Sequence, residues 1–290
     1  MSFKDALKSK KFTLTAEIFP PKGVDASEAI KKAVQLKGMV DAVNVTDNQR
    51  AVMRMNPIVL CHKLNHEGID SILQMSCRDR NSMGISSDIL AAYALGIRNV
   101  LSITGDYPIR EGKVLAKPVF ELDSVQLLDL IRKMEKGIDF NGSPLKGSPA
   151  FCLGSTVNPN SEQIELQIMK LKKKIDAGAE FIQTQVIYDI DVFKKFRDKV
   201  SSLGAGGRLP LLLGIFPLKS FEMAKFMEEK VPGVKVGDKA LKRMQNSKDP
   251  KQEGVQIAVE TIKELKSYCD GIHFMTMNDV EVVKEIIGRL

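Results

Sequence analysis

The 290-residue sequence contains no tryptophan and only four tyrosines. Proteins that bind nucleic acids typically combine a basic stripe with aromatic side chains on which the bases stack. This chain is basic, with a net charge of +7, but its lysines and arginines are spread along its whole length. We therefore exclude a nucleic-acid-binding protein and expect anionic small molecules as ligands.

The sequence also lacks long apolar runs and paired cysteines. No stretch of roughly 18 consecutive apolar residues is present, so we expect no membrane span. The N-terminal segment MSFKDALKSKKF is charged and has no apolar centre, which is unlike a secretory signal. The four cysteines are scattered without a C-x-x-C pair, as is typical of reduced thiols. We expect a cytoplasmic protein without a metal site.

The chain does contain a regular alternation of short apolar, β-branched runs and amphipathic segments with helical periodicity. Strands that alternate with helices predict a parallel sheet with right-handed crossovers. Eight such units within 290 residues favour a single-domain α/β protein, a (β/α)8 TIM barrel formed by residues 1–290. A doubly wound open sheet is the alternative. The predicted strands span residues 12–19, 40–46, 70–76, 98–104, 150–156, 180–187, 210–216 and 271–277.

Two predicted connections are longer than the others. One spans residues 105–122, after the fourth predicted strand, and the other spans residues 231–254, for which we predict a short helix. Active sites of TIM barrels lie at the C-terminal ends of the strands. Because the first connection leaves such an end, we expect it to form a lid or a ligand-binding loop.

Polar side chains occur where the predicted strands end, whereas the strand interiors are apolar. The C-terminal ends of the strands meet at one face of a barrel, so these side chains are expected to form one site. The residues concerned are Glu17, Asn44, Thr46, Asp47, Gln74, Ser76, Thr104, Asp106, Ser155, Thr156, Gln183, Gln185, His273 and Thr276.

Glu17 is the most distinctive of these residues, because the segment LTAEIFPPKG places a carboxylate inside an apolar strand that two prolines follow. On a pleated strand Thr15 and Glu17 point to the same face, while the apolar residues beside them point to the other. Partial burial at the mouth of a barrel would favour the neutral carboxyl, which can donate a proton. We therefore predict a general acid; an ion pair with Lys22 is the alternative.

Six blocks of the sequence together resemble the methylenetetrahydrofolate reductase family. They are AEIFPPKG, VTDN, ITGD, KKIDAGAEFIQTQVIYD, GIFPLKSFEMAKF and GIHFMTMN, and they occur in the family's order between Thr13 and Asn278. The resemblance implies a flavin-containing TIM barrel that reduces 5,10-methylenetetrahydrofolate to 5-methyltetrahydrofolate. It further implies FAD, with FMN as the alternative, NAD(P)H or a partner redox subunit as the electron donor, and an oligomer.

The resemblance also implies roles for individual residues. Glu17 matches the catalytic glutamate, the acid that protonates the departing nitrogen when the five-membered ring of the substrate opens. Asp106 matches the aspartate whose negative charge stabilises the resulting iminium cation between flavin and pterin. Gln185 matches the glutamine that hydrogen-bonds the stacked pterin or nicotinamide. The implied flavin contacts are Thr46, Gln74, Thr104, Gly105, Asp106 and Lys174.

The sequence departs from the better-known bacterial pattern at several positions. Gln74 occupies the place of a histidine, Met223 that of a glutamine, and Asp279 that of an arginine expected to contact the folate tail. Two alternative functions therefore stay open. One is a pterin-binding methyl-transfer barrel without flavin, and the other is a flavin-carrying subunit of a larger redox complex.

Overall fold

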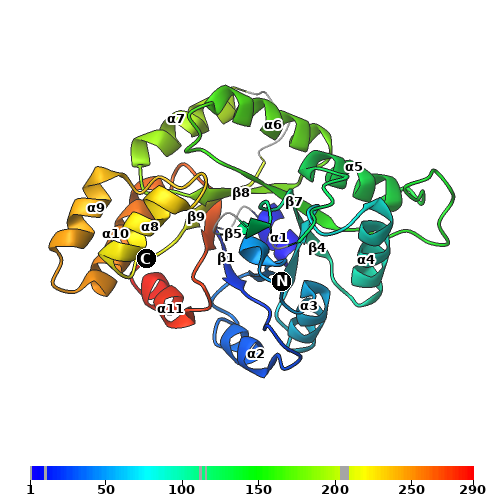
Figure 1. Cartoon of the computed structure of the whole chain (residues 1–290), viewed down its shortest axis with the longest axis horizontal. Coiled ribbons are helices and arrows are strands. Elements are labelled where there is room, and N and C mark those ends of the chain that lie inside the picture. Colours follow the sequence, from blue (N-terminus) through cyan, green and yellow to red (C-terminus); the bar gives the residue numbers. More distant parts are fainter. Residues whose placement is uncertain (1, 10–11, 111–112, 115, 203–208) are drawn as a thin grey trace.

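The computed structural model describes residues 2–9, 12–110, 113–114, 116–202 and 209–290. Eight parallel strands form a closed barrel in the order β1-β10-β9-β8-β7-β4-β3-β2, and helices surround it (Figure 1). The predicted TIM barrel is confirmed, and the alternative of an open, doubly wound sheet is wrong. The barrel strands are β1 (Thr13–Ile18), β2 (Ala42–Val45), β3 (Ser71–Ser76), β4 (Asn99–Ile103), β7 (Cys152–Val157), β8 (Phe181–Val186), β9 (Leu211–Ile215) and β10 (Gly271–Phe274).

The surrounding helices begin where the sequence provides capping residues. Asp123, for example, accepts hydrogen bonds from the backbone amides of Val125 and Gln126 at the start of α5. The helices are α2 (Ser27–Val34), α3 (Pro57–His66), α4 (Ser82–Ala94), α5 (Ser124–Glu135), α6 (Ile164–Asp176), α7 (Ile190–Ser201), α8 (Phe221–Lys230), α9 (Gly237–Asn246), α10 (Pro250–Leu265) and α11 (Val280–Gly288). None of the helices in the described part of the chain has the length and apolar character needed to cross a membrane.

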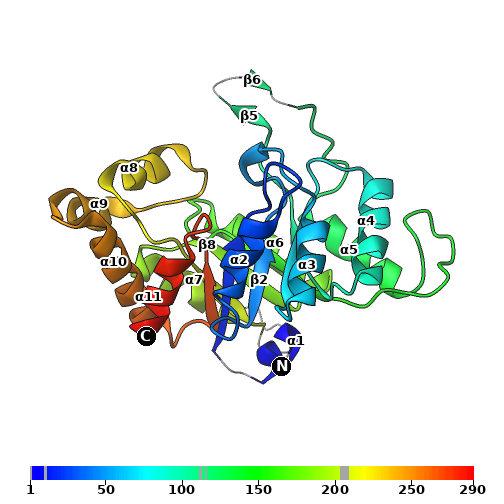
Figure 2. The ribbon, with the colours of Figure 1, turned by 90° about the horizontal axis from the view of Figure 1, so that it is seen from below.

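The N-terminal helix α1 (Phe3–Lys8) closes the lower end of the barrel (Figure 2). Phe3 is fully buried, and its ring meets the ring of Phe181 edge to face at 5.0 Å. The Phe181 ring fills the barrel so tightly that a Cβ on Gly154 would lie 2.2 Å from it. Apolar packing among the described residues therefore closes this end of the barrel, and we expect ligands to enter from the opposite end.

Both long connections contain regular structure. The loop after β4 carries the antiparallel pair β5 (Ile109–Arg110) and β6 (Lys113–Val114), which projects from the end of the barrel opposite α1 (Figure 2). Residues 111, 112 and 115 of this predicted lid lie outside the described residues. The connection over residues 231–254 contains α9, which confirms the predicted helix. Helices α8, α9 and α10 enclose an apolar cluster of their own that includes Leu218, Met227 and Met244.

Candidate active site

A cavity of about 630 Å³ lies at the C-terminal ends of the strands, beside α5 and α6. Its volume is within the range of about 300–1,000 Å³ that is usual for ligand-binding pockets. A smaller hollow of about 330 Å³, lined by Gly105, Tyr107 and Phe120, shares Thr104 and other residues with it. Six polar or charged side chains that line the main cavity are candidates for catalysis and binding: Glu17, Gln74, Thr104, Lys174, Gln185 and His273. All six were identified from the sequence, His273 as a polar residue at a strand end and Lys174 as an implied flavin contact.

Glu17 lies near the end of β1 with its side chain inside the barrel, and it is only 6% exposed. Its Oε1 atom accepts a hydrogen bond from Nε2 of Gln74 at 2.9 Å and lies 3.4 Å from Nε2 of His273. Its contacts therefore go to Gln74 and His273, and the predicted alternative of an ion pair with Lys22 is wrong. The other oxygen, Oε2, is buried and has no hydrogen-bond partner among the described residues.

A buried polar network lies directly below the carboxyl group of Glu17. Nδ1 of His273 is 2.9 Å from Oγ1 of Thr15, its neighbour in the β1–β10 register. Gln183 and Asn44 exchange two hydrogen bonds, of 2.9 and 3.2 Å, and Gln183 also donates to Thr15. If the Thr15 hydroxyl donates to Nδ1, then Nε2 of His273 carries the hydrogen and donates to Glu17. Oε1 of Glu17 is then held by two donors, and Oε2 remains available to a ligand.

Gln185 lies on β8, where the pairing with β9 shifts register between Gln183 and Val186. Such irregularities change the direction in which a side chain points. The Gln185 side chain accepts a hydrogen bond from the backbone amide of Val186 at 2.9 Å and lines the cavity. The predicted ligand-binding glutamine is thus at the cavity wall.

Lys174 on α6 is only 9% exposed, and its ammonium group donates a 2.6 Å hydrogen bond to the Thr156 carbonyl oxygen. Burial, and to a smaller extent the nearby Lys170, lower its pKa to about 8, and Asp123 opposes the shift. Lys170 and Lys173 line the same cavity. Lys174 is therefore not a solvated helix lysine, and together with Lys170 and Lys173 it gives one wall of the cavity a positive charge.

Thr46 and Asp106 do not line the cavity. Thr46 is fully buried just after β2, and its hydroxyl has no hydrogen-bond partner among the described residues. Asp106 is exposed in the loop after β4 and follows Gly105, which has a φ of +94°. A Cβ on Gly105 would lie 3.0 Å from Cβ of Arg78, so this turn favours glycine in both conformation and space.

Two of the departures from the bacterial pattern lie away from the cavity. Asp279 caps α11 by accepting from the Val282 amide, and it forms an ion pair with Lys219 at 2.7 Å. Met223 packs against the apolar cluster between α8, α9 and α10. Gln74, in contrast, lies in the cavity and contacts Glu17 directly.

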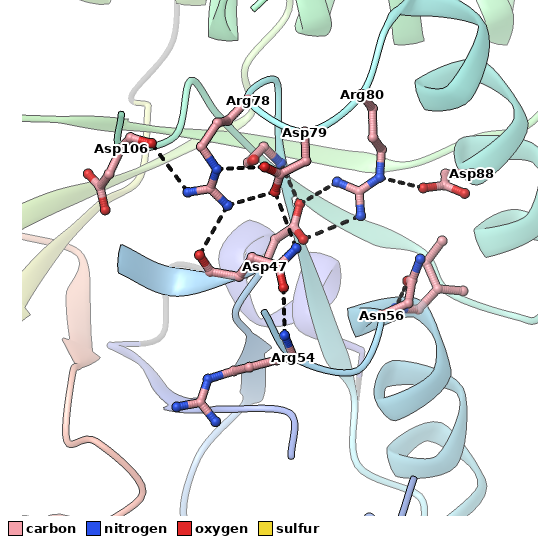
Figure 3. A network of polar contacts seen from close by, with 11 residues as sticks. Asp47, Arg54, Asn56, Arg78, Asp79, Arg80, Asp88 and Asp106 are labelled. Carbon is pink, nitrogen blue, oxygen red and sulfur yellow. Dashed lines mark hydrogen bonds and ion pairs between the residues drawn. The ribbon is translucent and has the colours of Figure 1, made fainter. Parts of the chain in front are cut away.

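A network of ion pairs and hydrogen bonds that was not predicted from the sequence connects the loops after β2, β3 and β4 (Figure 3). Arg78 binds both carboxylate oxygens of Asp79, at 2.7 and 2.6 Å. Arg80 pairs with Asp47 at 2.6 Å and with Asp88 at 2.7 Å. The charged segment CRDRN after β3 could have indicated such a network. The sequence does not show which residues its arginines contact, because several of them lie in loops distant in the chain.

The residues around the cavity fit a flavin. Glu17 lines the cavity, and its buried Oε2 atom has no partner among the described residues, so it needs a hydrogen-bond partner from a bound ligand. The three lysines would suit a phosphate group, and Gln74 and Gln185 provide amide groups for a heterocycle. The donor set thus matches an anionic cofactor that carries a polar ring.

A family model of methylenetetrahydrofolate reductases matches residues 2–290. Methylenetetrahydrofolate reductase 1 of Schizosaccharomyces pombe is 30% identical over 232 residues, which cover 77% of this chain and 36% of that protein. The chain spans about a third of the length of the eukaryotic relatives it matches. The 5,10-methylenetetrahydrofolate reductase of Escherichia coli is 23% identical over 283 residues, covering 94% of this chain and 89% of that one.

A solved structure resembles the whole chain. It is an uncharacterized protein from Clostridium thermocellum that binds two copies of 5-methyl-5,6,7,8-tetrahydrofolic acid, with a TM-score of 0.69, 14% sequence identity and 99% of each chain covered. At this identity the likeness supports the barrel fold alone. The match of the family model over nearly every residue goes further: the chain belongs to the methylenetetrahydrofolate reductase family.

Proposed function

We propose that this chain, as one barrel domain, uses a bound flavin to reduce 5,10-methylenetetrahydrofolate to 5-methyltetrahydrofolate. The observation that carries the proposal is the geometry of Glu17. Its carboxyl group lines the cavity, with Oε1 held by Gln74 and His273 and with Oε2 unpartnered among the described residues. Family membership and the folate bound to the C. thermocellum neighbour support a folate substrate.

Glu17 supplies the proton that the reaction needs. The bridging carbon of the substrate accepts a hydride only after its ring has opened to an iminium cation, and opening requires a proton on the departing nitrogen. Oε2 of Glu17 is the atom placed to give that proton, because both partners of the carboxyl group contact Oε1. Gln74 and His273 hold the orientation of the acid during this step.

The remaining cavity residues bind and orient the ligands. The flavin, when bound, supplies the hydride, and Lys170, Lys173 and Lys174 would hold its phosphate. Thr46, Thr104 and Gly105 would contact other parts of the same cofactor. Within this proposal Gln185 hydrogen-bonds the pterin ring, and the carboxylate of Asp106 at the rim stabilises the iminium cation.

The cofactor is FAD in this proposal, with FMN as the alternative, and NAD(P)H is the electron donor in an oligomeric, cytoplasmic enzyme. A partner redox subunit that supplies the electrons is the second arrangement. Gln74, which replaces the histidine of the bacterial pattern, does not distinguish these two electron donors, because its side chain contacts Glu17.

The test is an absorption spectrum of the purified protein without oxygen, followed by 5-methyltetrahydrofolate. Flavin bands that bleach on addition would support the folate–flavin reaction, and NADH in the same cuvette would then show whether the chain accepts electrons without a partner. Glu17→Gln should keep the flavin and its reduction by NADH but lose folate reduction by about 100- to 10,000-fold. A colourless protein that FAD and FMN fail to reconstitute would instead favour methyl transfer.

A further inference from the structure

Arg78 occupies an unusual position for an arginine, because its side chain is only 2% exposed although it lies in a loop at the barrel mouth. Its guanidinium group reaches three different segments. It binds Asp79 through two hydrogen bonds, donates to the Asn48 carbonyl oxygen at 3.0 Å and donates to the Asp106 carbonyl oxygen at 3.4 Å (Figure 3). The backbone of Arg78 also holds the far side of the β4 loop, because its carbonyl oxygen accepts from the Val119 amide at 2.8 Å.

The contacts of Arg78 continue to the segment that follows Glu17. The Asn48 side chain accepts from the backbone amide of Arg54 at 2.9 Å, and the Arg54 guanidinium donates to the Pro20 carbonyl oxygen at 2.9 Å. The ends of β1, β2, β3 and β4 are therefore joined by one chain of hydrogen bonds. Within this series of hydrogen bonds, Arg78 is the residue that contacts the loop of Asp106.

The backbone around Arg78 shows that the loops are held in specific conformations. Asn48, whose carbonyl oxygen Arg78 binds, has a left-handed φ of 44°, which is uncommon for a residue with a side chain. Gly105 adopts its φ of +94° directly against Cβ of Arg78. Conformations of this kind persist only where the surrounding contacts determine them.

We infer that Arg78 is a positioning residue that places Asp106 at the rim of the active site. The inference rests on the proposed function, in which the carboxylate of Asp106 stabilises the iminium cation. Arg78 does not touch that carboxylate; it binds the carbonyl oxygen of the same residue and the loops on either side. The side chain of Asp106 is then directed by the backbone that Arg78 holds.

Only arginine can make these contacts together. Its planar group offers five donors in a fixed arrangement, whereas lysine offers one compact ammonium group. Arg78→Lys therefore keeps the buried charge beside Asp79 but cannot reach Asn48 and Asp106 at the same time. Arg80→Lys is the matched control, because Arg80 is a nearby, partly buried arginine and its ion pairs go to Asp47 and Asp88, not to the Asp106 loop.

The experiment compares Arg78→Lys, Arg80→Lys, Asp106→Asn and the double variant Arg78→Lys/Asp106→Asn as purified flavoproteins. We expect Arg78→Lys to lower kcat for folate reduction by roughly tenfold or more, because small displacements of a reacting group have effects of this size. Flavin reduction by NADH and the effect of Arg80→Lys should stay within about twofold of the wild type. If Arg78 acts through Asp106, the double variant should be no slower than Asp106→Asn alone.

If the losses in kcat of the two single variants multiply in the double variant, Arg78 acts independently of Asp106. That result would overturn the inference and leave the role of Asp106 intact. An equal loss in Arg80→Lys would also overturn it, because the effect would then belong to the network in general. If Asp106→Asn alone has no effect on folate reduction, the proposed role of Asp106 fails and the inference fails with it.

A second measurement is independent of activity. The chain contains no tryptophan, so Tyr107→Trp places a single tryptophan, which can be excited selectively over the tyrosines, directly after Asp106. In this background Arg78→Lys should lower the fluorescence anisotropy of the tryptophan, and Arg80→Lys should not. An unchanged anisotropy in Arg78→Lys would overturn the inference even in a protein that proves inactive towards folate.

Discussion

Replacing Lys174 by methionine should stabilise the flavin-free protein at about pH 7 and weaken its binding of flavin. Burial lowers the pKa of Lys174 from its usual 10.5 to about 8, so the charged ammonium group lowers the free energy of unfolding. Each pKa unit corresponds to about 1.4 kcal/mol, which makes the cost about 3 kcal/mol. Loss of the hydrogen bond from Lys174 to Thr156 offsets about 1 kcal/mol. The expected net gain is about 2 kcal/mol.

The sign of the pH dependence follows from the same shift. Below about pH 8 the lysine is charged in both the folded and the unfolded protein, and the full cost is present. Between about pH 8 and about pH 10.5 the unfolded state binds more protons, so the stability of the wild type rises with pH by about 3 kcal/mol. Lys174→Met should lack this rise.

Urea denaturation of the flavin-free protein across this pH range measures the effect. Lys172→Met is the matched control, because Lys172 lies on the same helix, is exposed and pairs with Asp176. The control should follow the pH profile of the wild type. A Lys174→Met variant with a wild-type pH profile, or with lower stability at neutral pH, would refute the reasoning.

Three further predictions concern the acid and the packing. Gln74→Leu should lower folate reduction by about 10-fold more than it lowers flavin reduction, because it removes a donor to Glu17; equal losses in stopped-flow traces of both half-reactions would contradict this. His273→Phe should lower folate reduction by about 10-fold, because it removes the ring contact to Glu17 at 3.4 Å; wild-type turnover would show that the contact is structural only. Gly254→Ala should lower the free energy of unfolding by about 3 kcal/mol, because its Cβ would lie 1.7 Å from the Leu218 carbonyl oxygen; an unchanged urea midpoint would exclude the clash.

The eight strands were predictable because each is a local pattern of apolar and β-branched residues between turn signals. All eight predicted runs overlap observed barrel strands, with ends that differ by three residues or fewer. The position of Glu17 inside the barrel followed from the same period of two, because Thr15 and Glu17 share a face of β1. The sequence therefore determined the architecture and the placement of polar strand ends on one face.

The partners of these residues were decided by the tertiary structure. Gln74 contacts Glu17 and Arg78 contacts Asp106, although the residues of these pairs are 57 and 28 positions apart in the chain, and no local pattern specifies such pairs. The burial of Lys174 was equally hidden, because helical periodicity identifies the face of α6 but not the depth of the cavity beside it. Closure of the barrel brings the eight strand ends together, and the orientation of Glu17, the lowered pKa of Lys174 and the contacts of Arg78 all arise from that closure.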